Sequence, residues 1–185
     1  MTDPAASQIA DSVRLAWPAE AASIADLQRR FWATQWPAEL AERMLGEVTA
    51  QDMTLAWHTA ITRPPTASSR VLVAVGSGRV VGFATTTASA DDDAEPGVQG
   101  EIDQFVIDPP AQRRGHGSRL LNACADTLRS DGFRAASWWV GSEDDVLRRF
   151  LTSAGWSPDG ASREIGSEDE SVRLKQIRLH TDLSE

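Results

Sequence analysis

The sequence predicts a mixed α/β (α+β) fold built as a single domain. Runs rich in β-branched and aromatic residues alternate with runs whose apolar residues recur every three or four positions. Their order is one strand, three helices, two strands, then strand, helix, strand, helix and a final pair of strands. The 185 residues suffice for one substantial core, and neither a repeat nor a linker interrupts them. We therefore expect a flexible tail over residues 1–12 and one domain over residues 13–185.

The first third of the chain is expected to be a strand followed by three helices. Residues 13–17 form the strand-like run, and Pro18 and Glu20 then start a helix. Pro37 suits the first turn of a second helix, and an Arg-Pro-Pro sequence at residues 63–65 ends a third. The apolar residues spaced for burial on these helices are Ile24, Leu27, Phe31, Leu40, Met44, Val48, Met53, Trp57 and Ile61.

A hairpin, an acidic segment and a third strand occupy the middle of the chain. Residues 71–75 and 80–86 are β-rich, and the four residues between them include two glycines that suit positive φ angles. Residues 90–100 include Asp91, Asp92, Asp93 and Glu95. We interpret this segment either as a mobile surface loop or as a rim that attracts cations. The next strand spans residues 101–108 and stops at two prolines.

The last third alternates helices and strands. One helix, closed by an Asp-Gly pair, has its apolar residues at Leu120, Leu121, Cys124 and Leu128. Residues 135–140 form a strand. Ser142 with Asp145 three positions later resembles a capping box for a short helix that stops at Gly155. A final hairpin is expected over residues 161–165 and 172–179.

Composition narrows the class of partner. The formal net charge of -9 argues against nucleic acid and against anionic membranes, which both select basic surfaces. Cys124 is the only cysteine, so the chain has neither a disulfide framework nor a thiolate metal cluster. We expect a packed core thiol at this position, no metal ion and a cytoplasmic protein. No run approaches the length of a membrane span, and the start of the chain has no signal-peptide pattern.

The most informative segment is Gln112-Arg113-Arg114-Gly115-His116-Gly117-Ser118, which lies between a strand-like and a helix-like run. A strand that breaks at glycines and restarts as a helix leaves main-chain N–H groups at the positive end of the helix dipole. Such a site suits a phosphate or diphosphate. Two familiar phosphate motifs are excluded, because the chain contains neither G-x-x-x-x-G-K-[ST] nor G-x-G-x-x-G.

Residues 112–117 resemble the Q/R-x-x-G-x-G/A acetyl-CoA signature of the GCN5-related N-acetyltransferases. The resemblance extends along nearly the whole chain, through residues 13–14, 80–83, 105–109, 139–140, 150, 155–156 and 158–160. It implies a mixed, strongly twisted sheet of six or seven strands with helices on both faces. It also implies that the strand over residues 101–108 splays from the strand over residues 135–140, so that acetyl-CoA enters the gap.

The resemblance further implies which residues hold the cofactor. Backbone groups of Phe105, Val106 and Ile107 would pair with the pantetheine arm. The amides after Gln112, from Arg113, Arg114, Gly115, His116, Gly117 and Ser118, would hold the diphosphate. The two arginine side chains either add ion pairs or are simply solvated, and the His116 side chain is expected on the surface as a spectator. Asp144, at a position where the family often has Asn, and Phe150 are also placed at the cofactor.

Acetyl transfer to an amine requires a neutral amine. Deprotonating an amine of pKa about 10.4 at neutral pH costs roughly 4.6 kcal/mol, so a positioned base is valuable. Glu101 and Asp103 are the candidates: they are two residues apart on one strand and share a face, which Phe105 and Ile107 extend. The alternative is that one or both lie at the solvated end of the strand.

The leaving thiolate has no tyrosine to protonate it. Many family members use a tyrosine at the position of Leu151, and this chain contains none. The pKa of a thiol, about 8.5, lies only about 1.5 units above neutral pH, so departure as the unprotonated thiolate costs roughly 2 kcal/mol, and water can supply the proton. Five of the seven tryptophans are read as core residues or as an aromatic acceptor pocket: Trp32, Trp36, Trp57, Trp138 and Trp139.

Two functions follow from the sequence. The first is an acetyl-CoA-dependent N-acyltransferase that acetylates a small-molecule or peptide amine by direct attack within a ternary complex. The alternative is a non-catalytic acyl-CoA-binding module of the same fold, which the missing tyrosine and Asp144 favour. The acceptor amine is not encoded in any pattern that we recognise, and a homodimer through residues 172–179 stays open.

Overall fold

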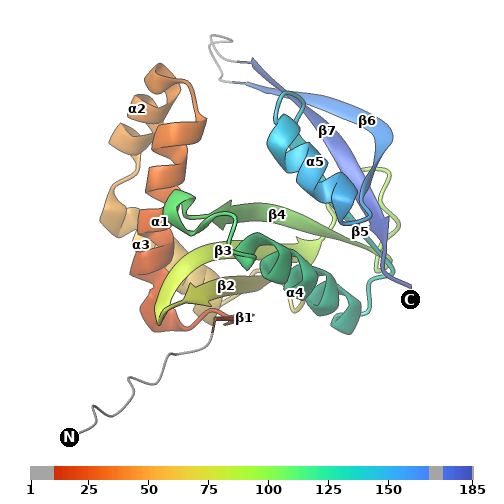
Figure 1. Cartoon of the computed structure of the whole chain (residues 1–185), viewed down its shortest axis with the longest axis horizontal. Helices are drawn as coiled ribbons and strands as arrows, with labels where there is room; N and C mark the ends of the chain where they lie inside the picture. The colour runs from red at the N-terminus through yellow and green to blue at the C-terminus, as the bar shows by residue number, and fades with distance from the viewer. Residues whose placement is uncertain (1–10, 167–172, 185) are drawn as a thin grey trace, which may run out of the picture. The chain divides into compact units, whose positions relative to one another are not determined.

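A computed structural model of the chain describes residues 11–166 and 173–184 (Figure 1). The strands are β1 (Ser12–Leu15), β2 (Arg70–Gly76), β3 (Arg79–Ala88), β4 (Gln99–Ile107), β5 (Ala135–Gly141), β6 (Ser157–Gly166) and β7 (Arg173–Asp182). The helices are α1 (Ala21–Gln35), α2 (Ala38–Glu47), α3 (Ala50–Thr62), α4 (His116–Ser130) and α5 (Asp145–Ser153), with short 3₁₀ turns η1 (Pro18–Glu20) and η2 (Pro109–Ala111). This order confirms the predicted succession of elements. Most of the expected tail, residues 1–10, lies outside the described residues, and Ser12 already belongs to β1.

The strands form one sheet in the order β1-β2-β3-β4-β5-β7-β6. β1 pairs antiparallel with β2, and β7 pairs antiparallel with both β5 and β6. β4 and β5 are parallel, which their connection through a helix allows. The predicted mixed sheet of six or seven strands is therefore confirmed.

The chain divides into two compact units. Unit 1 comprises Met1–Thr85 with Gln104–Cys124, and unit 2 comprises Thr86–Asp103 with Ala125–Glu185. β3, β4 and α4 each contribute residues to both units. The single domain over residues 13–185 stays a prediction. No helix of the described segments is long and apolar enough to cross a membrane.

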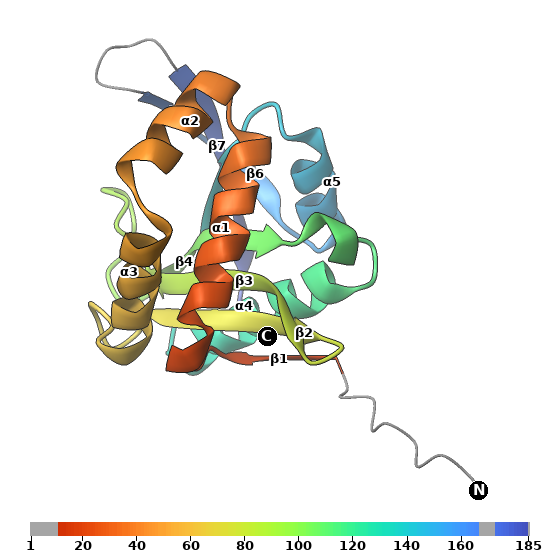
Figure 2. The ribbon, with the colours of Figure 1, turned by 90° about the vertical axis from the view of Figure 1, so that its left-hand side faces the viewer.

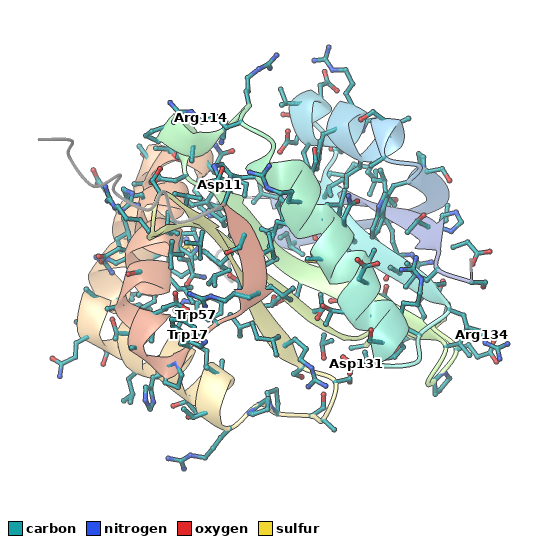
Figure 3. The ribbon with its side chains drawn as sticks, turned by 60° about the horizontal axis from the view of Figure 1, so that its bottom comes forward. Asp11, Trp17, Trp57, Arg114, Asp131 and Arg134 are labelled. Carbon is teal, nitrogen blue, oxygen red and sulfur yellow. The ribbon has the colours of Figure 1, made fainter. Side chains whose placement is uncertain are left out.

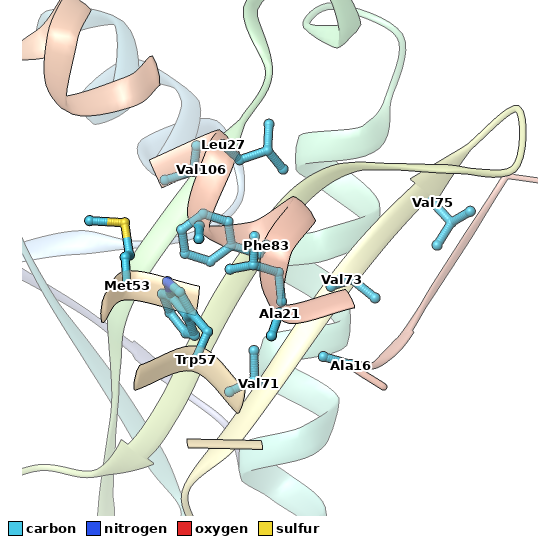
Figure 4. Close-up of a cluster of buried hydrophobic side chains, with 12 residues drawn as sticks. Ala16, Ala21, Leu27, Met53, Trp57, Val71, Val73, Val75, Phe83 and Val106 are labelled. Atoms are coloured by element: carbon cyan, nitrogen blue, oxygen red, sulfur yellow. The ribbon is translucent and has the colours of Figure 1, made fainter. Parts of the chain in front are cut away.

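The core of unit 1 lies between the sheet and α1 with α3. Figure 2 shows α1 and α3 covering β2 and β3, and Figure 4 shows the side chains that meet there. Val73 and Phe83 are fully buried, and the Trp57 ring meets Phe83 edge-on at 5.0 Å between ring centroids. Burial of one such side chain stabilises the fold by roughly 1.5–3 kcal/mol. The helices therefore pack through β-branched and aromatic side chains of one sheet face.

The opposite face of β2 is covered by the start of α4. Gly76 shares this face with Leu72 and Ala74, because alternate strand residues point the same way. A Cβ atom at Gly76 would lie 2.8 Å from the His116 ring, so the first turn of α4 lies against this end of β2. The prediction of helices on both faces of the sheet is confirmed within unit 1.

Cys124 is fully buried, as expected of a core thiol. Burial raises the pKa of this thiol to about 12, so it stays protonated and is not a nucleophile at neutral pH.

The core of unit 2 lies where β5, β6 and β7 meet α5. Trp138 on β5 and Trp156 before β6 are buried and meet edge-on, with ring centroids 6.4 Å apart. Leu151 of α5 is fully buried and Leu179 of β7 nearly so. The core readings of Trp57 and Trp138 are thus confirmed.

Three local predictions need correction. Positive φ angles occur at Ser77 and Gly78 in the hairpin turn, whereas Gly76 ends β2. α5 is capped by Asp144, whose Oδ1 accepts a hydrogen bond from Leu147 N at 2.9 Å, and not by Ser142. β6 begins at Ser157, four residues before the predicted strand, and residue 172 of the predicted hairpin lies outside the described residues.

A β-bulge lies in the β3–β4 pair. Two hydrogen bonds mark its ends: Ser89 N to Gln99 O at 3.0 Å, and Asp108 N to Val81 O at 2.8 Å. Between them β4 has one residue more than β3, which defines a bulge. A bulge reverses the alternation of side chains beyond it. The prediction that Phe105 and Ile107 extend the face of Glu101 is therefore wrong.

Candidate functional site

The segment between β4 and α4 is a turn that leads into the N-terminus of the helix. β4 ends at Ile107, the turn η2 follows, and α4 begins at His116. Arg113 and Gly115 both have left-handed φ angles, 60° and 81°. Left-handed residues within a turn aim neighbouring N–H groups to a common side, which is the geometry of an anion-binding nest. Gly115 adopts this conformation without the strain that a Cβ atom would impose.

The amides of this turn are available to an external ligand. Arg119 N donates to Gly115 O at 3.1 Å and closes the first turn of α4, so the preceding amides have no partner in the helix. Within residues 11–166 and 173–184, the amides of residues 113–118 bind no protein acceptor. They stand at the positive end of α4, whose first turn has no acidic residue. This arrangement suits a diphosphate.

Arginine side chains surround the turn. Arg119 is held by Asp11, with 3.2 Å between Nη2 and Oδ2, and Asp11 Oδ1 also accepts from Ser77 N at 3.4 Å. Figure 3 shows Asp11 and Arg114 at the same end of unit 1. Arg113 and Arg114 are exposed and pair with no carboxylate in the part of the chain that the structure describes. Neither guanidinium is therefore committed to a carboxylate of the described residues.

His116 is buried, so its expected place on the surface is wrong. Its residue is only 5% exposed, and its ring packs against the end of β2 at Gly76. Nδ1 lies 3.2 Å from Arg119 Nη2. A guanidinium can only donate, so Nδ1 accepts and the neutral ring carries its proton on Nε2, 3.8 Å from Asp11 Oδ2. The side chain anchors the start of α4, and the role of its amide in cofactor binding stays a prediction.

β4 loses its β5 partner partway along its length. The parallel register comprises Gln99↔Ala135, Gly100↔Ala136 and Glu101↔Ser137. β5 continues to Gly141 as the partner of β7, and β4 continues to Ile107. This short register is the one expected of a splayed strand pair. Gln112 Nε2 donates to Ile107 O at 3.2 Å, so one carbonyl group assigned to the pantetheine arm already has a protein partner.

Glu101 is the stronger of the two base candidates. It is half-buried, whereas Asp103 is exposed. Burial raises the pKa of the Glu101 carboxyl, and the charges of Asp103 and Asp91 raise it further. A hydrogen bond from Ser89 Oγ to Oε2 at 3.4 Å and the charge of Arg163 act in the opposite direction. A carboxylate with a raised pKa is a better proton acceptor.

The acidic segment is tied down by an arginine that the sequence analysis missed. Arg178 on β7 has a side chain 8% exposed and forms ion pairs with Asp91, Asp93 and Asp159. Trp139 Nε1 also donates to both oxygens of Asp91 at 3.0 Å. The segment is largely exposed, as expected of a surface loop, but two of its aspartates are tied to Arg178. Asp91 and Arg178 are 87 positions apart, so no local pattern could reveal the contact.

The candidate residues fall into two sets, one in each unit. Unit 1 brings together the 112–118 turn with Phe105, Val106 and Ile107. Unit 2 contains Asp103 and Glu101, on whose carboxyl the charges of Asp103 and Asp91 act, and also Asp144 and Phe150. The Asp144 carboxylate is engaged in capping α5, and Phe150 is half-buried on that helix. No group of three or more His, Cys, Asp or Glu side chains in the described ranges is arranged to hold a metal ion.

Comparison with known proteins gives a family match. Residues 21–156 match the model of the Acetyltransferase (GNAT) family. No curated protein matches the sequence.

Solved structures share the fold at low sequence identity. One is yncA from Salmonella typhimurium with its cofactor acetyl-CoA, 20% identical with a TM-score of 0.69 over 95% of each chain. A second is the PaiA N-acetyltransferase of Thermoplasma acidophilum in complex with coenzyme A, 12% identical with a TM-score of 0.68 over 94% of this chain and 99% of that chain. A third is the ribosomal-protein-S18-alanine N-acetyltransferase of Escherichia coli, 16% identical with a TM-score of 0.64 over 95% of this chain and 96% of that chain. At these identities the likeness establishes a common fold.

Proposed function

The chain belongs to the GNAT family of acetyltransferases, and on this premise we propose that it transfers an acetyl group from acetyl-CoA to the amine of a small molecule or peptide. The observation that carries the proposal is the turn of residues 113–118, whose amides bind no protein acceptor within the described residues. A diphosphate satisfies such amides, and coenzyme A contains one. Solved relatives of this fold contain acetyl-CoA or coenzyme A, which supports the same ligand here.

In the proposed complex, unit 1 holds the nucleotide part of acetyl-CoA. The amides of residues 113–118 bind the diphosphate, and Arg113 and Arg114 add charge. The left-handed Gly115 keeps the turn open to the phosphates. The main chain of Phe105 and Val106 supplies hydrogen-bonding groups for the pantetheine amides.

Glu101 is the proposed base. The amine nitrogen attacks the thioester carbonyl carbon, and its proton passes to Glu101 directly or through a water molecule. The C–S bond then breaks, and the thiolate takes a proton from water, because the chain contains no tyrosine. Neutralising the amine requires roughly 4.6 kcal/mol at neutral pH, and a raised Glu101 pKa reduces the uphill part of that proton transfer.

A non-catalytic acyl-CoA-binding module is the second candidate. Asp144 favours it, because this side chain takes a position often held by Asn at the pantetheine arm but here caps α5. A module of this kind binds the cofactor and releases no thiol.

Thiol release and calorimetry distinguish the two candidates. The protein is titrated with acetyl-CoA, and thiol release is then followed with small amines, diamines, amino acids and lysine-containing peptides. Saturable release with at least one amine, lost in Gly117→Trp together with cofactor binding, supports the enzyme. Tight cofactor binding without release on any amine supports the module. Absence of cofactor binding contradicts both.

A further inference from the structure

Arg178 lies at the centre of a charge cluster on one face of unit 2. Its guanidinium donates to Asp93 through two nitrogens, Nη1 to Oδ1 and Nη2 to Oδ2, both at 2.6 Å. Nη1 also donates to Asp91 Oδ2 at 3.0 Å, and Nε donates to Asp159 Oδ2 at 2.6 Å. The fork thus joins the β3–β4 segment to β6 and β7. The guanidinium lowers the pKa of the Asp93 carboxyl below its ordinary value.

A chain of contacts runs from this cluster to Glu101. Asp91 accepts from Arg178 and from Trp139 Nε1. The Asp91 main-chain amide donates to Ser89 Oγ at 3.4 Å, and this hydroxyl lies 3.4 Å from Glu101 Oε2. The Arg178 fork and the Trp139 indole together hold the Asp91 carboxylate where its charge acts on Glu101.

The cluster depends on its single guanidinium. Three carboxylates converge on Arg178, and without its charge they repel one another. Breaking a buried ion pair by removing one partner leaves uncompensated charge, which drives the remaining groups toward water. Asp93 and the backbone that carries Asp91 lie on an exposed loop, so release of this loop is the least costly response.

We propose that Arg178 is a positioning residue for the acetyl transfer: it holds Asp91 beside Glu101 and so sets the pH at which Glu101 becomes a competent base. The inference rests on the proposed function only through the role of Glu101. The link between Arg178 and the ionisation of Glu101 can be measured whether or not the protein is an enzyme.

The groups facing Glu101 determine the sign of the effect. They are Asp103 on β4, Ser89 and Asp91 at the start of the β3–β4 segment, and Arg163 on β6. Release of the loop removes the Asp91 charge and lets water reach Glu101, and both changes lower the pKa of its carboxyl. If the loop instead stays in place, loss of the Arg178 charge alone raises the pKa of the Glu101 carboxyl. The direction of the shift therefore separates positioning from simple charge removal.

The test follows the ionisation of Glu101 directly. Glutamate side-chain carboxyl carbons are labelled with ¹³C, and the Glu101 resonance is assigned by its loss in Glu101→Gln. Its titration is recorded in the unaltered protein and in Arg178→Met, Arg178→Lys and Asp91→Asn. Arg173→Met is the matched control, because Arg173 is an exposed arginine on the same strand with Glu164 as an ion-pair partner.

We expect the Glu101 midpoint to move to lower pH in Arg178→Met and in Asp91→Asn, and to stay unchanged in Arg173→Met. The double variant Arg178→Met/Asp91→Asn should move no further than Arg178→Met alone, since release of the loop already removes the Asp91 charge from Glu101. Arg178→Lys retains the charge but not the fork, so it should shift less than Arg178→Met. If Arg178→Met does not fold, Asp91→Asn and Arg178→Lys still decide the outcome.

A midpoint that is unchanged or raised in Arg178→Met, or additive shifts in the double variant, overturns the inference. The acidic limb of the pH–rate profile should move with the midpoint in an active enzyme. An unaltered protein that releases no thiol with any amine overturns the proposed function instead, and the carboxyl titration then judges the link between Arg178 and Glu101 by itself.

Discussion

Replacing Gly115 by alanine should weaken acetyl-CoA binding without unfolding the protein. Gly115 has a φ of 81°, where an L-residue is disfavoured by roughly 1–2 kcal/mol. An added Cβ would lie 3.1 Å from Arg119 Nη1, the far end of a flexible side chain that can move aside. Backbone strain is therefore the main cost of the substitution.

The strain should appear in the binding free energy. No described protein group accepts from the amides of residues 113–118, so the free turn can relax from its strained shape. Binding the diphosphate restores that shape at a cost of about 1–2 kcal/mol, which corresponds to roughly a 5- to 30-fold loss of affinity.

Isothermal titration calorimetry with acetyl-CoA measures this loss, and urea unfolding measures stability. Gly132→Ala is the matched control: Gly132 follows the other end of α4, has a φ of 96°, and has no atom within 4 Å of an added Cβ. Gly132 N donates to Arg129 O at 3.0 Å, so its backbone is held in the free protein. Gly132→Ala should therefore lose roughly 1–2 kcal/mol of stability and keep its acetyl-CoA affinity. Unchanged affinity in Gly115→Ala, or equal losses in the two variants, would refute the reasoning.

Four further substitutions test the energetics of the fold and the site. The raised pKa of Glu101 means that its ionised form destabilises the folded state, so stability falls as the pH rises from the ordinary glutamate pKa of about 4.3 through the raised value. At about pH 8, Glu101→Gln should therefore unfold at a higher urea concentration than the unaltered protein, and well below pH 4.3 the two should unfold alike. The variant should also lose turnover. A lower stability of the variant at pH 8 would contradict this prediction. In the unaltered protein Trp57 Nε1 donates to Gln28 Oε1 at 2.7 Å inside the core. Trp57→Phe removes this buried donor and should lower the free energy of urea unfolding by roughly 1–3 kcal/mol. An unchanged free energy of unfolding would contradict this prediction. Gly82→Ala places a Cβ 2.7 Å from a β4 carbonyl oxygen and should destabilise the fold by about 1–3 kcal/mol. Gly46→Ala has open space around its Cβ in α2 and should stabilise the fold by roughly 0.5–1 kcal/mol. Changes in stability of the same sign in both variants would refute this comparison.

Local sequence signals predicted the elements around the cofactor turn. The two prolines after β4 end the strand, and the glycines at positions 115 and 117 mark the turn. The apolar residues at helical spacing in α4 begin directly after this turn. Each signal acts within a few residues, so the order of strand, turn and helix is encoded locally. The left-handed φ angles of Arg113 and Gly115 were not part of these predictions.

Contacts between distant segments could not be predicted. His116 looks like a surface residue beside two arginines, and its burial depends on Gly76, forty positions earlier, which leaves room for the ring. The ion pairs of Asp91 and Asp93 could not be predicted, because their partner Arg178 lies beyond both α4 and α5 in the sequence. Residues 101–107 of β4 contain neither glycine nor proline, so no local signal marks the β-bulge and the sequence predicts side chains that alternate strictly between the two faces. In each case the conformation depends on a contact with a residue far away in the sequence, which forms only when the chain packs.

An amide chemical-shift titration tests the central claim most directly. Uniformly ¹⁵N-labelled protein is titrated with acetyl-CoA, and the backbone resonances of residues 113–118 are followed. We predict that these amides shift together and saturate at the affinity measured by calorimetry, as expected of N–H groups that donate to one diphosphate. Saturable binding of acetyl-CoA with these resonances unmoved would contradict the account.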